Sequence, residues 1–272
     1  MEAITFQTNQ NCQAEPISDD DAEAFFVEMA NRERGNLTGY DCQKCMNRGF
    51  FWEYRDGYRF CRECECMDVR KSIDAIRKSG LEDFLDEKTF SAFQCKAQWR
   101  KDMKSRVLQF VGDRDRGWLL LSGQPGCGKT HLATAAAGKF LRAGASVRYM
   151  RWVEDGTRIK ANVNDDEAYE KALRPLKSCK VLYIDDLFKR KNDQRDKRNL
   201  DTVDRGDIRL AFEILDHRYV NRMVTIISTE RTLDELYQID EATGSRIYER
   251  SKKYQLIFDN DPKKNFRIYG DG

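Results

Sequence analysis

A glycine-rich turn lies between an apolar run and an alanine-rich stretch in "LLLSGQPGCGKTHLATAAAG", residues 119–138. Gly123, four further residues and then Gly128-Lys129-Thr130 form the spacing of a phosphate-binding loop. Glycines let successive backbone N–H groups point into one concavity, and the start of the next helix adds the positive end of its dipole. We expect Lys129 to reach the outer phosphates and the Thr130 hydroxyl to bind magnesium. The predicted nucleotide-binding residues are Gly123, Gln124, Pro125, Gly126, Cys127, Gly128, Lys129, Thr130 and His131.

An acidic pair follows a second apolar run in "KVLYIDDLFK". Residues 181–184 are expected to form a buried strand, and open α/β sheets place their ligands at the carboxyl ends of such strands. Asp185 is expected to be a magnesium ligand with Thr130, and Asp186 to orient or deprotonate the attacking water. The alternative is that the two aspartates cap the next segment. Together with the glycine loop, the pair predicts that the chain binds and hydrolyses ATP, with Lys129, Asp185 and Asp186 as catalytic residues.

Five of the nine cysteines fall within residues 42–66. Two Cys-x-x-Cys pairs separated by 15 residues have the spacing of a tetrahedral zinc site. The predicted ligands are Cys42, Cys45, Cys61 and Cys64, with Cys66 as the alternative to Cys64. Between the pairs, the turn dipeptide Asp56-Gly57 predicts a β-hairpin, so we expect a zinc ribbon with a structural ion. Disulfides and a redox Cys-x-x-Cys are the competing uses of these thiols.

Composition and charge narrow the class of protein. The 272 residues carry a net charge of +2, and residues 1–40 hold eight acids and only two bases, so the rest of the chain is basic. A mildly basic body is compatible with contact to nucleic acid but is mostly solvated charge. No apolar run approaches 18 residues and the start lacks a basic and apolar leader, so we expect no membrane span, no secretion signal and a cytoplasmic location.

The elements that must position these residues alternate between helix and strand. We expect helices near residues 19–34, 67–80, 96–111, 129–142, 165–176, 205–220, 232–238 and 240–252, with 81–88 as a connector. We expect strands at residues 118–121, 147–150, 181–184, 223–228 and 254–258. Such alternation predicts an α/β fold with a parallel sheet that carries helices on both faces.

The sequence resembles the DnaC and DnaI type of bacterial and phage replicative-helicase loaders, within the AAA+ ATPases. The segments that carry the resemblance occur in the expected order and extend over most of the chain. They are "GNLTGYDCQKC", "RKSGLEDFLDEKTFSAF", "SGQPGCGKTHL", "VLYIDDLFK", "FEILDHRY", "IISTERTLDEL" and "GSRIYERS". The resemblance implies an AAA+ P-loop NTPase core at residues 89–272, a linker helix and connector at 69–88, and a small zinc-ribbon and helical domain at 1–68 that docks on the helicase.

The resemblance also implies roles for single residues. Thr229 matches the sensor that responds to the γ-phosphate, although the register is uncertain by one position. Arg250, or Arg246 one helical turn before it, matches the finger that acts on a neighbouring subunit's nucleotide; the alternative is a surface arginine paired with an acid. Thr89, Phe90 and Phe93 in "TFSAF" are expected either to border the adenine or simply to pack in the core.

Two departures from the broader AAA+ pattern qualify the implied activity. The acidic pair is Asp-Asp, so its second carboxylate is one methylene shorter than in Asp-Glu, and we expect slow, partner-stimulated hydrolysis. The chain ends about 14 residues after the last expected strand, which leaves no room for a helical lid. The basic segment at residues 188–199 is either a contact for single-stranded DNA or a solvated loop.

The function that the resemblance implies is ATP-dependent loading of a DnaB-type replicative helicase onto single-stranded DNA, with self-association of the loader on the helicase. The expected cofactors are ATP, Mg²⁺ and Zn²⁺. One alternative is an IstB-like transposition accessory ATPase. Another is an ATP-binding switch with negligible turnover.

Overall fold

The computed structural model describes residues 19–78, 82–114, 117–189, 203–258 and 261–270. The chain divides into two compact units, Met1–Met67 and Asp68–Gly272. Each unit is described here by itself.

The first unit is a helix packed on a β-hairpin. Helix α1 (Asp19–Arg32) precedes strands β1 (Phe50–Arg55) and β2 (Tyr58–Glu63), which pair antiparallel with Arg55 opposite Tyr58. The turn between them places Asp56 and Gly57 at positive φ, as a tight two-residue hairpin requires, so the predicted hairpin is confirmed. Asn31 of α1 exchanges two hydrogen bonds with the backbone of Trp52, which fixes the helix to the outer edge of β1.

The second unit is built on a five-stranded sheet in the order β4-β5-β6-β3-β7, and every neighbouring pair of strands is parallel. The strands are β3 (Trp118–Gly123), β4 (Val147–Arg151), β5 (Val181–Asp185), β6 (Val224–Thr229) and β7 (Gln255–Phe258). Because all five run in one direction, their carboxyl ends meet at one edge, where β3 ends in the glycine loop and β5 in the acidic pair.

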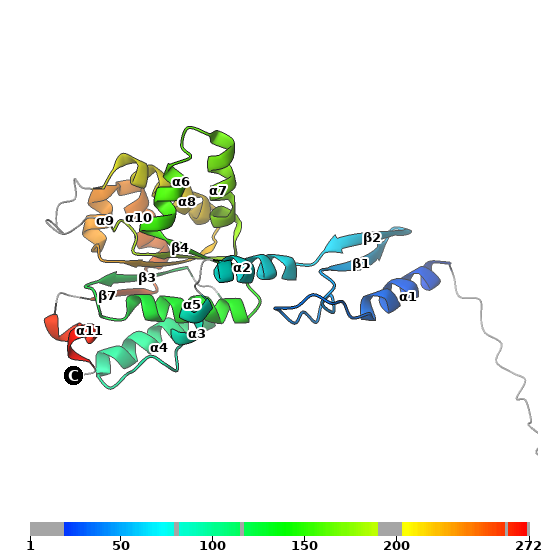
Figure 1. Ribbon diagram of the computed structural model, residues 1–272, viewed down its shortest axis with the longest axis horizontal. Helices are drawn as coiled ribbons and strands as arrows, with labels where there is room; N and C mark the ends of the chain where they lie inside the picture. The colour runs from blue at the N-terminus through cyan, green and yellow to red at the C-terminus, as the bar shows by residue number, and fades with distance from the viewer. Residues whose placement is uncertain (1–18, 79–81, 115–116, 190–202, 259–260, 271–272) are drawn as a thin grey trace, which may run out of the picture. The chain divides into compact units, whose positions relative to one another are not determined.

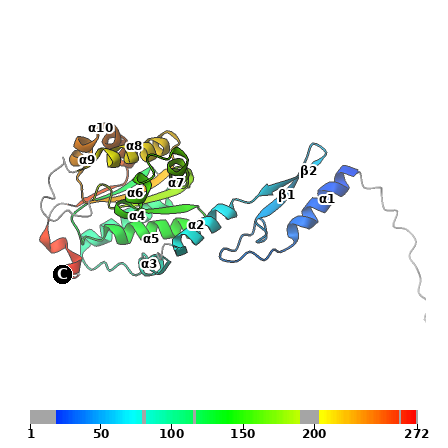
Figure 2. The same ribbon diagram turned by 45° about the horizontal axis from the view of Figure 1, so that its top comes forward.

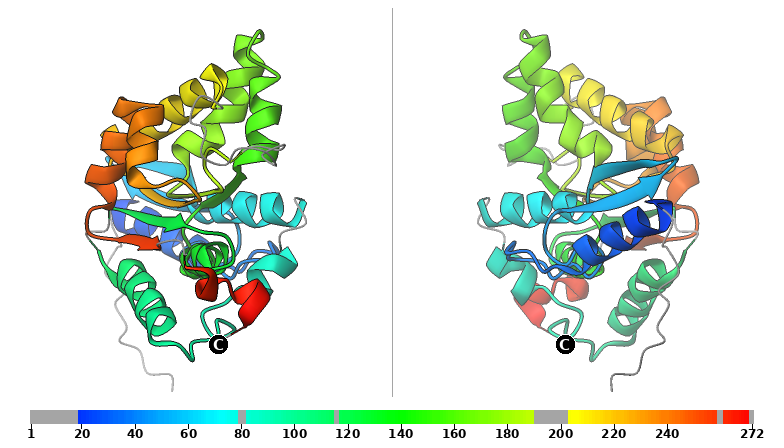
Figure 3. Two further views of the ribbon diagram at one scale, coloured as in Figure 1. Left: turned by 90° about the vertical axis from the view of Figure 1, so that its left-hand side faces the viewer. Right: turned by 90° about the vertical axis from the view of Figure 1, so that its right-hand side faces the viewer.

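Helices cover both faces of this sheet (Figures 1 and 2), as the alternation of elements predicted. One face carries α4 (Gln98–Gly112) and α5 (Lys129–Arg142). The other carries α6 (Trp152–Lys160), α7 (Asp166–Ser178), α8 (Arg205–Val220), α9 (Leu233–Ile239) and α10 (Glu241–Ser251). Figure 3 shows the two helical layers in views along the sheet.

Each face has its own apolar core, because successive side chains of a strand point to opposite faces. In β3, Leu120 joins the cluster beneath α8 and α10, whereas Leu119 and Leu121 join the cluster beneath α4 and α5. All three leucines are fully buried, so this central strand holds the glycine loop on a rigid base.

The structure contains helices at several places where the sequence analysis expected none. Residues 81–88, expected as a connector, contain α3 (Glu82–Glu87). Helix α6 begins directly after β4 and has acidic residues in its first turn and basic residues in its last, which favours its dipole. The other described elements are α2 (Cys66–Lys78), the 3-10 helix η2 (Pro262–Lys264) and α11 (Phe266–Tyr269), the last two lying after β7.

Candidate functional site

The phosphate loop connects β3 to α5, and its glycines are required by both conformation and space. Gly123, Gly126 and Gly128 have φ of 132°, 81° and 100°. A Cβ at Gly123 would lie 2.4 Å from the carbonyl oxygen of Phe258, and one at Gly128 would lie 2.7 Å from the ring of Phe93. Any other residue would therefore both strain the backbone and displace a neighbour.

Lys129 is the first residue of α5, and its side chain folds back onto the loop. Its ammonium donates to the carbonyl oxygens of Gly123 (2.6 Å) and Gln124 (2.8 Å). The side chain is buried, and burial lowers the pKa of the lysine. A buried ammonium held only by carbonyls gains an opposite charge when an anion binds at the amino end of α5, so the loop is suited to a polyphosphate.

Asp185 accepts hydrogen bonds from four hydroxyl groups. Thr130 donates over 3.2 Å, Tyr149 over 2.8 Å and Tyr183 over 2.7 Å, and Ser228 makes a further close hydrogen bond. Burial, followed by the charge of Asp185, raises the pKa of both tyrosines, so they remain protonated donors. The arrangement holds an Asp185 oxygen 3.2 Å from the Thr130 hydroxyl, so the two side chains offer neighbouring oxygen atoms that could serve as magnesium ligands.

The sequence analysis missed both tyrosines and Ser228. Tyr183 lies two residues before Asp185, so strand alternation already places it on the same face. Tyr149 has no such local signal, because only the pairing of β4 with β5 brings it opposite Tyr183.

Asp186 turns away from Asp185. Its φ of 58° is unusual for a residue with a side chain, and its amide donates to Ser228 Oγ over 3.1 Å. The carboxylate lies 2.8 Å from the ammonium of Lys189, which also lies 3.1 Å from Glu230. Asp186 is thus held near the loop but engaged by a lysine.

Thr229, the predicted sensor, does not face the acidic pair. Its side chain is fully buried, donates to the carbonyl oxygen of Leu187 and accepts from the amide of Arg231. Adjacent residues of a strand point to opposite faces, so the residue that contacts Asp185 is Ser228, one position earlier.

The segment that was expected to border the adenine packs against the phosphate loop. Phe90 and Phe93 are buried, and the ring of Phe93 meets that of His131 edge to face at 5.1 Å. His131 Nε2 lies 2.8 Å from the carbonyl oxygen of Thr89, and burial lowers the pKa of the imidazole. These residues pack against the phosphate loop, where the ring of Phe93 lies beside Gly128.

The two candidate finger arginines have different surroundings. Arg246 pairs with Asp216 at 2.8 Å and lies over the rings of Phe212 and Tyr219. Arg250 Nε is buried and has no hydrogen-bond partner within the described parts of the chain. Arg246 is therefore committed to its own subunit, which leaves Arg250 as the candidate for a contact with another.

A segment after β7 also reaches the phosphate loop, which the sequence analysis did not foresee. Gln124 and Asp261 exchange two hydrogen bonds of 2.7 Å between side chain and backbone. The amide of Phe266 donates to the carbonyl oxygen of Gly126 over 3.0 Å. The guanidinium of Arg100 lies 4.3 Å from the ring of Phe266, so α4 supports this contact.

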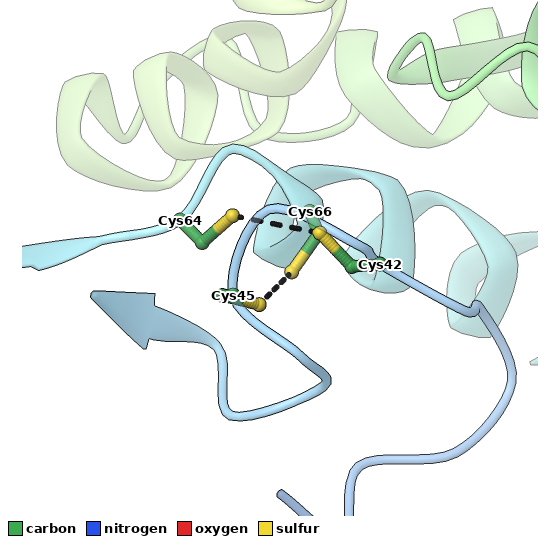
Figure 4. Close-up of side chains that lie close together, drawn as sticks. All are labelled: Cys42, Cys45, Cys64 and Cys66. Atoms are coloured by element: carbon green, nitrogen blue, oxygen red, sulfur yellow. Dashed lines mark hydrogen bonds between the residues drawn. The ribbon is translucent and has the colours of Figure 1, made fainter. Parts of the chain in front are cut away.

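Four buried thiols point toward one another in the first unit (Figure 4). They belong to Cys42, Cys45, Cys64 and Cys66, and their Sγ atoms all lie within 4.8 Å of one another. Cys42 and Cys64 are 3.8 Å apart, and Cys45 and Cys66 are 3.5 Å apart, too far for a disulfide. Four thiolates about 2.3 Å from one ion would have this spacing, so the donor set fits zinc.

The thiol cluster differs from the predicted ligand set, because Cys61 is absent from it and both Cys64 and Cys66 belong to it. Cys61 lies within β2, opposite Trp52, and its side chain is exposed. Cys64 lies where β2 ends, and its amide donates to the carbonyl oxygen of Gly49 over 2.8 Å, beside the first cysteine pair. Because strand β2 continues past Cys61 to Glu63, Cys61 lies within the hairpin and not beside the other thiols.

The surroundings of Cys45 favour its ionised form, whereas burial raises the pKa of Cys64. The Gly49 amide donates to Cys45 Sγ at 3.3 Å. Burial opposes ionisation of Cys45, but this bond and the neighbouring thiols lower its pKa to about 7. Thiolates are the form that binds a metal.

The basic segment at residues 188–199 lies outside the described residues from 190 onward, so only Phe188 and Lys189 can be placed. None of the described helices has the length and apolar character that crossing a bilayer requires.

Comparison with known proteins is consistent with this geometry. A family model described as IstB-like ATP binding protein matches residues 59–250. Phage-like element PBSX protein XkdC of Bacillus subtilis (strain 168) is 33% identical over 232 residues, covering 80% of this chain and 82% of that protein. Replicative helicase loader DnaC of Escherichia coli (strain K12) is 22% identical over 194 residues, covering 70% and 72%.

Two solved structures share the fold of the second unit. The crystal structure of the DnaC helicase loader matches with a TM-score of 0.50 and 22% identity, over 63% of this chain and 95% of that one. AMPPCP-bound DnaA from Aquifex aeolicus matches with a TM-score of 0.50 and 17% identity, and the match spans only 53% of that protein. The chain belongs to the IstB-like ATP-binding family and carries the AAA+ core that this family shares with DnaC, which confirms the resemblance.

Proposed function

We propose that this protein is an ATP-dependent loader that places a DnaB-type replicative helicase on single-stranded DNA. The observation that carries the proposal is the union, in one chain of this family, of a nucleotide core with a four-thiol module. The 70% coverage by a relative named as a replicative helicase loader supports it. Residues 1–68 are assigned to helicase docking, 69–88 to the linker and 89–272 to the ATPase.

The nucleotide site supports hydrolysis by the chain's own residues. Lys129 and the loop amides bind the phosphates, and Thr130 and Asp185 hold magnesium, which supplies charge stabilisation to the transferring phosphoryl group. Asp186 accepts a proton from the attacking water. Turnover is slow in the free protein, because the Asp186 side chain is short and already engaged by Lys189 at 2.8 Å.

The first unit uses zinc as a structural ion. Cys42, Cys45, Cys64 and Cys66 leave no open coordination position, so the ion stabilises a fold and takes no part in chemistry. Helix α1 exposes Phe25, Phe26 and Met29, which give this small unit an apolar surface for the helicase.

Subunits of the loader associate on the helicase, and Arg250 reaches the neighbour's nucleotide. A guanidinium at that place stabilises charge on the phosphoryl group, and Arg250, unlike Arg246, forms no ion pair with its own chain among the described residues. Residues 188–199 contact the DNA phosphates in this assembly.

Mass photometry tests the proposal directly. The protein is mixed with the DnaB-type helicase of its own replicon or host, with and without ATP and single-stranded DNA, and Lys129→Ala serves as the variant that cannot bind phosphates. A discrete complex heavier than the helicase ring, weakened in Lys129→Ala, is the expected result. Absence of any complex under all conditions contradicts the loader assignment.

Two alternative functions predict different results in binding and turnover experiments. The family model is named for IstB-like proteins, so specific binding to a transposase without any effect on helicase would favour a transposition accessory ATPase. The ion pair of Asp186 with Lys189 is compatible with a binding switch, and equal turnover by the wild type and Asp186→Asn would favour that.

A further inference from the structure

Lys189 holds together two carboxylates beside the nucleotide site. Its ammonium lies 2.8 Å from Asp186 Oδ2 and 3.1 Å from Glu230 Oε1. Burial opposes its charge, but the bonds to Asp186 and Glu230 outweigh burial and raise the pKa of the lysine. One cation between two carboxylates forms a stable bridge. The residue roles proposed above for hydrolysis include none for Lys189.

The backbone that carries Lys189 is fixed, although its side chain is 40% exposed. Phe188 has a φ of 59° and is buried, with its ring 5.4 Å from that of Trp152 in an edge-to-face contact. The amide of Lys189 donates to the carbonyl oxygen of Asp186 over 2.9 Å. The long side chain can therefore change its partner while the backbone stays in place.

Short contacts connect this bridge to the phosphate loop. The Asp186 amide bonds to Ser228, Ser228 bonds to Asp185, and Asp185 accepts from Thr130 at the end of the loop. The charges of Glu230, Asp186 and Lys189 also act on the ammonium of Lys129. The bridge thus lies close enough to Lys129, the lysine of the phosphate loop, for their charges to interact.

We propose that Lys189 is a second phosphate-binding lysine. When a nucleoside triphosphate binds, the Lys189 ammonium breaks its ion pairs with Asp186 and Glu230 and binds the terminal phosphate instead. This inference rests on the nucleotide site proposed above. A terminal phosphate is a stronger partner for an ammonium than carboxylates that are partly solvated. A diphosphate lacks that group and leaves the bridge closed.

This change of partner by Lys189 makes the availability of the Asp186 carboxylate as a base depend on whether a triphosphate occupies the nucleotide site. In the structure, one oxygen of Asp186 accepts a hydrogen bond from the Lys189 ammonium. When Lys189 moves to the phosphate, that oxygen becomes free to accept a proton from water. Hydrolysis then requires the triphosphate both as substrate and as the ligand that releases the base.

Equilibrium binding of magnesium complexes of the β,γ-imido analogue of ATP and of ADP tests the inference. Lys189→Met keeps the length of the side chain and removes its charge. We expect it to weaken binding of the triphosphate analogue by about tenfold or more and to change ADP binding by less than about twofold. An equal loss for both ligands, or no loss for either, overturns the inference.

Two further variants make the test specific. Lys160 also bridges two carboxylates, Asp204 at 3.0 Å and Asp207 at 2.8 Å, so Lys160→Met is the matched control and should leave both affinities unchanged. Glu230→Gln removes one competitor for Lys189 and should tighten triphosphate binding. This gain must disappear in the double variant Lys189→Met/Glu230→Gln, and a gain of equal size there contradicts the inference.

The outcome is separable from the loader assignment. If no helicase complex forms but Lys189→Met discriminates between triphosphate and diphosphate, the loader assignment fails and Lys189 keeps its role. If the helicase complex forms and Lys189→Met does not discriminate, the loader assignment stands and the role of Lys189 is refuted.

Discussion

Substitution of single cysteines can distinguish between two sets of zinc ligands: the four thiols that cluster in the structure and the four that the sequence spacing predicts. Cys66→Ser removes a member of the cluster, and Cys61→Ser removes an exposed thiol of β2. We expect Cys61→Ser to retain one zinc ion for each chain and Cys66→Ser to lose it. The two variants make the same chemical change five residues apart, so each is the control of the other.

The size of the effect follows from the geometry. Sulfur atoms about 2.3 Å from a tetrahedral ion lie about 3.8 Å apart, and the Cys42–Cys64 distance of 3.8 Å already matches this. Among the described residues 19–67, Val27 is the single buried apolar residue other than the cysteines. Apolar burial therefore contributes little to the stability of this unit. Structural zinc contributes about 10–16 kcal/mol in zinc-finger peptides, which exceeds the stability of a small unit. Loss of zinc should therefore unfold the first unit.

Zinc content by mass spectrometry and limited proteolysis of the first unit are the two assays. Cys66→Ser should be cleaved rapidly before residue 68, while ATP-analogue binding by the second unit stays within about twofold of the wild type. Retention of zinc by Cys66→Ser together with its loss from Cys61→Ser would refute the assignment of the cluster. Retention by both variants would show that neither Cys61 nor Cys66 is required to hold the ion, which also refutes the assignment of Cys66.

Four further variants test the second unit. Asp186→Asn should retain ATP binding but lower phosphate release at least about 100-fold, because it removes the carboxylate that we propose as the base. Arg250→Ala should lower turnover of the assembled loader without changing its melting temperature, whereas Arg246→Ala should lower the melting temperature, because Arg246 pairs with Asp216. Arg218→Met should lower the free energy of unfolding in urea by about 2–4 kcal/mol, because three buried carbonyl oxygens lose their donor.

The phosphate loop and its sheet were predictable because their signals are local. The spacing of Gly123, Lys129 and Thr130 specifies a backbone shape that few other residues allow, and α5 begins and ends where the sequence predicted. The apolar run before Asp185 likewise predicted β5 and its carboxyl end. These are features of consecutive residues, so a short stretch of sequence was enough to predict them.

The zinc spacing was predictable only in part. Cys42 and Cys45 form one turn of the chain, and their proximity follows from sequence. Whether Cys61 or Cys66 completes the cluster depends on where the hairpin ends, and the antiparallel pairing carries β2 on to Glu63. A hairpin two residues shorter would bring a different thiol to the same place.

The sequence by itself determined the nucleotide chemistry, since glycines, a lysine and an acidic pair at strand ends have few other uses. Tertiary structure alone decided which side chains serve it. It placed Ser228, and not Thr229, against Asp185, because neighbouring strand residues face opposite sides, and it brought Tyr149 to Asp185 from the adjacent strand β4. Side-chain direction and long-range pairing follow from the packing of the whole sheet, which no short stretch of residues contains.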